Sequence, residues 1–172
     1  YEENEKTTVE FDNDVTVSGT ADISINGAVD DIKSASAWSY KNKFESYDKL
    51  SQMDDFGYVA QLAGYAKGLR KKAGGWWVIN KATGDFKYVP ATGLDIEEEC
   101  GKINSSLKTL ENNVFERCFE AETEFFRSKP TGNKVLCKTC SFCDYRKDCW
   151  PSLQQKPMLK SQAINPKMVD YV

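Results

Sequence analysis

The sequence has no histidine, no long apolar segment and no strong excess of one charge. Its 172 residues contain no run of about 18 consecutive apolar residues, so we expect no transmembrane helix and no membrane partner. It also lacks the basic-then-apolar pattern of a secretory signal. The chain begins at Tyr1 rather than at methionine, and we therefore expect a fragment or a protein whose upstream part is not included. The mean hydropathy of −0.58 and the 28% of charged residues predict a soluble protein of the cytoplasm.

The formal net charge of −3 does not by itself indicate a nucleic-acid-binding protein. Residues 33–72 are locally basic, however, with eight lysines and arginines against four acidic residues. A basic stretch suits a phosphate backbone when an acidic metal site lies beside it. A solvated helix face accounts for the same charges, and charge alone favours that explanation. The length is sufficient for one domain with a hydrophobic core.

The clearest local pattern is a β-hairpin over residues 15–36, VTVSGTADISINGAVDDIKSAS. The Asn-Gly pair at 26–27 is the preferred two-residue turn, because both central residues need a positive φ. The first strand carries Asp22, and the second carries Asp31 and Lys33, which share a face because strand side chains alternate. Two carboxylates hold a divalent cation, and an ammonium group positions or activates water. These groups are the minimum for metal-dependent phosphodiester hydrolysis. Taken alone, the hairpin is explained better as a solvated acidic surface.

The residues after the hairpin predict helices and strands in alternation. An amphipathic helix is expected at 54–72, with acidic residues at its start and basic residues at its end. Gln61 and Tyr65 lie four residues apart and share one face of it. Further strands are expected at 76–80 and 86–89, a second helix at 96–111, a short helix at 114–126, a loop at 129–133 and an extended strap after Pro151. This order predicts an α/β sandwich with a mixed sheet.

Cysteines are concentrated near the C-terminus. Four of the six lie in residues 136–151, LCKTCSFCDYRKDCWP. In a secreted protein they would predict disulfides, but without secretory features such spacing indicates a metal or iron–sulfur site. Unligated thiols are the alternative.

Four features, in this order, resemble the RecB-like branch of the PD-(D/E)xK nuclease superfamily. The sequence Gly19-Thr20-Ala21-Asp22 resembles its first strand motif, and Asp31-Ile32-Lys33 resembles (D/E)xK. The segment from Gln61 to Tyr65 resembles the helical QxxxY motif. Cys140, Cys143 and Cys149 have the C-x2-C-x5-C spacing of members with an iron–sulfur cluster, such as AddB and the CRISPR-adaptation nucleases. Residues 117–119 (RCF) and 132–133 (GN) look most like the single-domain exonucleases of tailed phages.

The resemblance implies a restriction-endonuclease-like core over residues 1–127, with a central mixed β-sheet flanked by helices. It implies a cysteine knuckle and C-terminal strap over 128–172, packed on that core and not an independent domain. The implied activity is Mg²⁺- or Mn²⁺-dependent DNA cleavage, as an exonuclease on single-stranded or duplex ends. The implied setting is phage-type recombination, replication or repair in a bacterial host, with recombination or replication proteins as partners. The alternatives are a catalytically impaired DNA-binding or scaffold module of the same fold and a CRISPR-adaptation-type nuclease.

The resemblance also implies roles for single residues. Asp22 and Asp31 would coordinate the cation, with the backbone carbonyl of Ile32 as a further ligand. Lys33 would position the attacking water and stabilise charge on the phosphate. Gln61 and Tyr65 would orient the lysine, the substrate backbone or the metal shell. Asp30 is the second choice as a ligand, should a bulge shift the strand register.

A complete cluster site needs a fourth thiolate besides Cys140, Cys143 and Cys149. Cys118 is the first choice because of its RCF setting, and Cys137 is the second. Cys100 is expected to be a plain thiol. Four thiolates suit a four-iron–four-sulfur cluster or a structural Zn²⁺, and the resemblance favours the cluster.

Overall fold

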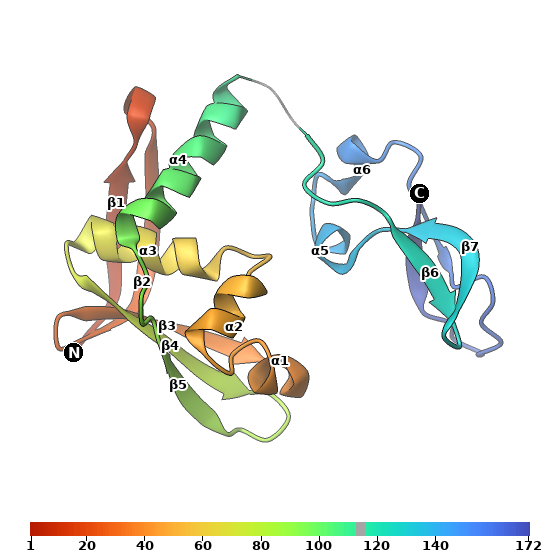
Figure 1. The fold of residues 1–172 in the computed structure, drawn as a ribbon, viewed down its shortest axis with the longest axis horizontal. Helices are drawn as coiled ribbons and strands as arrows, with labels where there is room; N and C mark the ends of the chain where they lie inside the picture. The colour runs from red at the N-terminus through yellow and green to blue at the C-terminus, as the bar shows by residue number, and fades with distance from the viewer. Residues whose placement is uncertain (113–115) are drawn as a thin grey trace. The chain divides into compact units, whose positions relative to one another are not determined.

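The structure is a computed structural model that describes residues 1–112 and 116–172 (Figure 1). The chain divides into two compact units, Tyr1–Val114 and Phe115–Val172. No helix in the described residues is long and apolar enough to cross a membrane.

The N-terminal unit is built on a five-stranded sheet in the order β1-β2-β3-β4-β5. The strands are β1 Glu2–Glu10, β2 Thr16–Ile25, β3 Ala28–Ala35, β4 Lys72–Asn80 and β5 Phe86–Pro90. Strands β3 and β4 pair in parallel, whereas the other neighbours are antiparallel. The prediction of a mixed α/β unit with a mixed central sheet flanked by helices is therefore confirmed.

The β2–β3 hairpin is confirmed with the predicted turn. Asn26 and Gly27 both have positive φ values, 51° and 78°, as a two-residue turn requires. Because β3 then pairs in parallel with β4, the chain must cross over between these strands, and helices supply the connection. They are α1 Ala37–Lys41, α2 Tyr47–Gln52 and α3 Tyr58–Leu69.

Helix α3 is shorter than the predicted range of 54–72. The carboxylate of Asp54 accepts hydrogen bonds from the backbone N–H groups of Tyr58 and Val59, so Asp54 caps the helix from outside. At the other end, Arg70 adopts a left-handed conformation, which stops the helix before β4 begins. The helix packs against β1, β2, β3 and β4 and also against α4 Ile96–Glu111.

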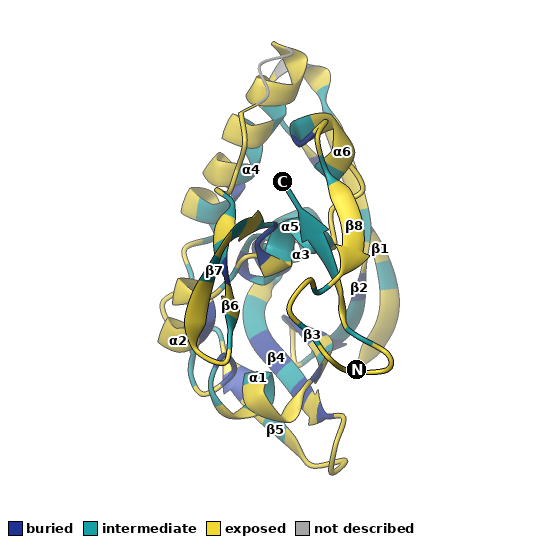
Figure 2. Cartoon of the chain, turned by 90° about the vertical axis from the view of Figure 1, so that its right-hand side faces the viewer, coloured by how far each residue is buried: buried dark blue, intermediate teal, exposed yellow. Residues whose placement is uncertain are grey.

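The core lies between this helical layer and the sheet. Its largest fully buried side chains come from both layers, and Figure 2 marks the buried positions of β4 in dark blue. They are Val29, Leu50, Leu62, Trp76 and Val78.

Two glycines of α3 predict opposite effects on stability when replaced by alanine. A Cβ at Gly68 would lie 2.0 Å from Thr7 Oγ1 and 2.9 Å from the carbonyl oxygen of Thr8. We expect Gly68→Ala to lower the free energy of unfolding by about 1–2 kcal/mol, because the helix must move away from β1. The nearest atom to a Cβ at Gly64 is 3.9 Å away, so Gly64→Ala should raise stability by up to about 1 kcal/mol through helix propensity. Urea unfolding measures both, and equal effects of the two variants would contradict this packing.

The C-terminal unit contains a four-stranded sheet in the order β6-β7-β9-β8. The strands are β6 Glu122–Phe126, β7 Lys129–Val135, β8 Gln154–Pro157 and β9 Met168–Tyr171, and two short helices lie between them, α5 Lys138–Ser141 and α6 Arg146–Cys149. Residues 114 and 115 of the predicted helix lie outside the described residues, and for 116–126 the prediction is wrong. The predicted loop at 129–133 is part of β7, and the strap contributes β8 and β9.

The physical reason for these differences is a two-residue turn and a buried carboxylate. Arg127 and Ser128 both have positive φ values, 48° and 62°, and join β6 directly to β7. The buried side chain of Glu124 accepts hydrogen bonds from Thr131 Oγ1 at 2.6 Å and Asn133 Nδ2 at 2.8 Å. It also accepts one from the hydroxyl of Tyr171 at 2.6 Å, so one carboxylate ties β6, β7 and β9 together.

Candidate active site

The predicted acidic residues meet where β2 and β3 separate. The two strands pair only from Ile23–Asp30 to Ile25–Ala28, next to the turn. Asp22 lies just beyond the last pair, and its Oδ2 accepts a hydrogen bond from the backbone N–H of Ile32 at 2.8 Å. The carboxylate of Asp22 therefore bridges the opening between the strands, next to that of Asp31.

A chain of polar contacts leads from Asp31 to helix α3. Lys33 Nζ lies 2.7 Å from Asp31 Oδ2 and donates a hydrogen bond to Gln61 Oε1 at 2.9 Å. Gln61 Nε2 in turn donates to the hydroxyl of Tyr65 at 3.0 Å. The structure thus brings together all five side chains that the sequence motifs singled out, from two strands and one helix.

Burial controls the electrostatics of Asp31. Only 2% of this residue is exposed, and burial raises the pKa of its carboxyl to about 6, an effect that Lys33 offsets and Asp22 reinforces. Asp31 Oδ2 is buried and forms an ion pair with Lys33 Nζ at 2.7 Å. A buried carboxylate beside a second carboxylate suits a hard divalent cation.

The side chains here would supply only part of a coordination shell. Among the residues that the structure describes, no three His, Cys, Asp or Glu side chains are grouped so that they could hold a metal ion. Mg²⁺ is commonly bound through one or two carboxylates together with waters and substrate phosphates. Asp22 and Asp31 would supply the two carboxylates of such an arrangement.

Tyr58 is a residue of this site that the sequence motifs did not indicate. The ammonium group of Lys33 lies 4.8 Å from the centre of its ring, and that of Lys43 lies 4.5 Å from it. Tyr58 precedes Gln61 by three residues, so both side chains lie on one face of α3. This helical spacing could have indicated from the sequence that Tyr58 lies beside Gln61. An aromatic residue at the start of a helix is usually a packing residue, however.

Asp30, the second choice as a metal ligand, has other partners. The register of β3 against β4 does shift between Val29 and Asp30. The carboxylate of Asp30 is buried and accepts hydrogen bonds from Trp77 Nε1 at 3.1 Å and from the hydroxyl of Tyr88 at 2.9 Å. Asp30 therefore anchors two aromatic side chains of β4 and β5.

The C-terminal unit gathers the predicted cluster residues around one small cavity of about 160 Å³. Among the residues that line this cavity are the four cysteines chosen first, Cys118, Cys140, Cys143 and Cys149. Arg117 holds the segment with Cys118 in place, because its Nε donates to the carbonyl of Cys149 at 2.9 Å and its guanidinium stacks on Trp150.

Cys137 does not line the cavity, but it contacts Cys140, which does. Its Sγ accepts a hydrogen bond from the backbone N–H of Cys140 at 3.4 Å. Burial raises the pKa of the Cys140 thiol to about 12, and the nearby sulfur atoms of Cys137, Cys143 and Cys149 add to this effect. All six cysteines are free thiols, and Cys100 is buried alone on α4. Cys118 thus lines the same cavity as Cys140, Cys143 and Cys149, and Cys137 contacts Cys140, but no three of the described cysteines are grouped closely enough to hold a metal ion as they stand.

A scan of protein-family models finds no model that matches this chain. Searches of the curated proteins and of the solved structures find no match either. A proposal about function therefore rests on the sequence motifs and on the geometry described above.

Proposed function

We propose that this chain is a Mg²⁺- or Mn²⁺-dependent deoxyribonuclease with a core of the restriction-endonuclease type. The observation that carries the proposal is the contact chain from Asp31 through Lys33 to Gln61, with Asp22 beside it. A paired, buried carboxylate and lysine could be a simple ion pair. The burial of Asp31 beside a second carboxylate, that of Asp22, supports a cation-binding role instead.

The residues divide the work of phosphodiester hydrolysis. A divalent cation held by Asp22 and Asp31 would neutralise charge on the phosphate and lower the pKa of water. The ammonium group of Lys33 can donate hydrogen bonds to the attacking water or to a phosphate oxygen. Gln61 and Tyr65 hold that ammonium group in one position, since the Gln61 amide contacts both side chains. Action at DNA ends, in phage-type recombination, replication or repair, is the setting that the resemblance implies.

We also propose that the cysteine cavity holds a four-iron–four-sulfur cluster, with structural Zn²⁺ as the alternative occupant. Four thiols around one cavity of about 160 Å³ support this. A bound cluster or metal would stabilise the C-terminal unit, because ligand binding and folding are coupled in such sites.

The test is cleavage of labelled linear DNA, single-stranded and duplex, by the full chain. We expect products with Mg²⁺ or Mn²⁺ and none with EDTA. Calorimetry without DNA should detect Mn²⁺ binding that Asp22→Ala removes. If the substrate stays uncut and the wild type and Asp22→Ala bind Mn²⁺ equally, the nuclease proposal is wrong. The remaining explanation is a non-catalytic module of the same fold. A circular single strand that is cut as fast as a linear one would exclude an exonuclease.

A further inference from the structure

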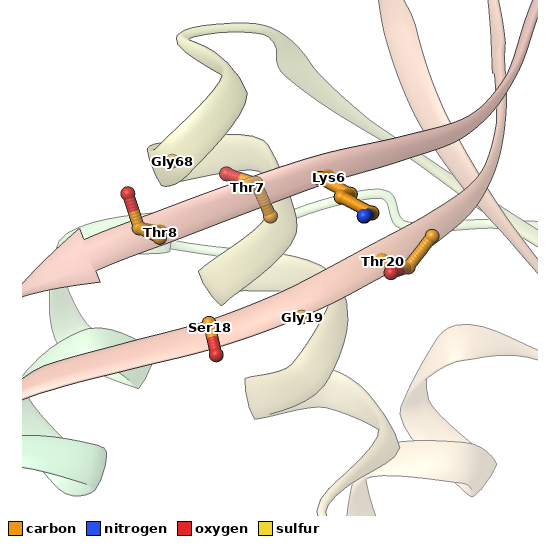
Figure 3. A pocket seen from close by; sticks show the side chains of 7 residues that line it. All are labelled: Lys6, Thr7, Thr8, Ser18, Gly19, Thr20 and Gly68. Atoms are coloured by element: carbon orange, nitrogen blue, oxygen red, sulfur yellow. The ribbon is translucent and has the colours of Figure 1, made fainter.

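A row of amine and hydroxyl side chains lies on β1 and β2 next to the candidate active site. Lys6 is paired with Thr20 across the two strands, and Thr8 is paired with Ser18. All four residues are exposed. They line a concavity of about 480 Å³, in which Figure 3 shows Lys6 and Thr20 extending towards each other between the strands. We call these four residues the hydroxyl row.

The hydroxyl row lies on the side of the sheet that faces away from α3. Thr7 stands between Lys6 and Thr8 and is buried against Gly68 of α3. Gly19 stands between Ser18 and Thr20, and a Cβ there would lie 2.7 Å from the Tyr65 ring. Because strand side chains alternate, the hydroxyl row projects from the opposite side.

Strand β2 leads from the hydroxyl row to the active site. Asp22 follows Thr20 by two residues and lies at the opening between β2 and β3. The residue across from it on β1 is Asn4, where the regular pairing of the strands lapses. Asp22 and Asn4 line a second concavity of about 470 Å³, together with Glu3, Ile23 and Ile32. Two concavities therefore follow each other along the same pair of strands, and the second contains a candidate metal ligand.

The chemistry of the first concavity suits phosphate groups. Lysine, serine and threonine side chains are common donors to the oxygens of a nucleic-acid backbone. Within the described residues, Lys6 forms none of the ion pairs that occupy six other lysines, and no carboxylate lines this concavity. Alternate residues of a strand are about 6.7 Å apart, a spacing close to that of successive phosphates along an extended DNA strand.

We propose that the hydroxyl row binds the sugar–phosphate backbone of one DNA strand and leads it to Asp22. The proposal deepens the proposed function and rests on it. Contacts of this kind carry no sequence information, so binding should be independent of base sequence. The four side chains lie on one pair of neighbouring strands, β1 and β2, so they can follow the backbone of one DNA strand. We therefore name single-stranded DNA as the ligand.

The test measures the affinity of the full chain for a fluorescent single-stranded oligonucleotide in EDTA, where cleavage cannot occur. We expect Lys6→Ala to weaken binding about 3–10-fold and Lys6→Glu to weaken it further. Loss of one phosphate contact should reduce the salt dependence by about one unit of slope. Thr20→Val, which keeps the shape and removes the hydroxyl, should weaken binding about 2–5-fold. The matched control is Lys81→Glu, an exposed lysine at the end of β4, which should not change the affinity.

Equal affinities of Lys6→Glu and the wild type, or equal losses in Lys6→Glu and Lys81→Glu, would overturn the proposal. Circular dichroism of each variant checks that the fold is kept. The two proposals fail in different ways. If the wild type never cuts DNA but Lys6→Glu still loses affinity, only the nuclease is wrong. If DNA is cut and Lys6→Glu leaves both affinity and KM unchanged, only the hydroxyl row is wrong.

Discussion

Asp31→Asn is expected to abolish DNA cleavage and, at the same time, to stabilise the protein in the absence of metal. Asparagine keeps the shape of the side chain but removes the charge that would hold the proposed divalent cation. Such a cation would supply several kcal/mol of transition-state stabilisation, so the cleavage rate should fall at least about 10³-fold. Gel-based cleavage of a labelled oligonucleotide in Mg²⁺ measures this loss.

The gain in stability follows from the raised pKa of Asp31. Its carboxyl has a pKa of about 6 in the folded protein, against an ordinary value of 3.8 for an exposed aspartate. Between these two values the folded state binds more protons than the unfolded state, so this group's contribution to stability falls as the pH rises through 4 to 6. At neutral pH the ionised carboxylate costs up to about 3 kcal/mol, which Asp31→Asn should recover. Urea unfolding in EDTA should therefore show a gain of about 1–3 kcal/mol at pH 7.5 that shrinks towards pH 4.5.

The neighbouring aspartate provides the matched control. Asp30 is buried as well, but its carboxylate accepts hydrogen bonds from Trp77 and Tyr88. Asp30→Asn should lower stability by about 1 kcal/mol and leave cleavage in Mg²⁺ close to the wild-type rate. The assignment of Asp31 fails if Asp31→Asn cuts within tenfold of the wild type. It also fails if Asp31→Asn is less stable than the wild type in EDTA at pH 7.5.

Local patterns predicted the parts of the fold that carry the site. The turn at Asn26 and Gly27 is sufficient to place two short strands side by side. The four-residue spacing of Gln61 and Tyr65 places both side chains on one face of a helix. What sequence could not predict are contacts between distant segments. The partners of Asp30 come from β4 and β5, and the turn at Arg127 and Ser128 uses residues that rarely adopt positive φ. Tyr58 joined the site only because β3 brings Lys33 to the start of α3.

The sheet of the C-terminal unit also depends on contacts between residues that are far apart in the sequence. The sequence predicts a helix, a loop and a strap in place of its strands, because β7 contains proline and glycine and the turn before it contains neither. The buried carboxylate of Glu124 organises three of these strands through partners up to 47 residues away. The cysteine spacing was informative, in contrast, because ligand spacing is a local property. The three cysteines with this spacing line one cavity, together with Cys118, which was chosen from its RCF setting.

If the cysteine cavity holds the proposed cluster or metal, Cys140→Ser is expected to remove it and to unfold the C-terminal unit. Cys140 is the central thiol of the group, since Cys137, Cys143 and Cys149 all lie close enough to influence its pKa. Structural Zn²⁺ in zinc-finger peptides contributes about 10–16 kcal/mol to folding, which is at least comparable with the whole stability of a typical small domain. After anaerobic purification, the wild type should be brown and absorb at about 400 nm if it holds a cluster. It should be colourless and contain zinc if it holds Zn²⁺ instead. Cys140→Ser should lose the metal in either case, and hydrogen exchange of β6 and β7 should become fast.

Three further cysteine variants complete this experiment. Cys100→Ser is the control, because Cys100 lies alone on α4 in the N-terminal unit and should leave the metal content unchanged. Cys118→Ser and Cys137→Ser identify the fourth ligand. Cys118 lines the cavity with the other three thiols, whereas Cys137 is not among the lining residues, so we expect Cys118→Ser to cause the larger loss of metal. A Cys140→Ser protein with wild-type metal content and unchanged exchange of β6 would show that these cysteines are unligated thiols.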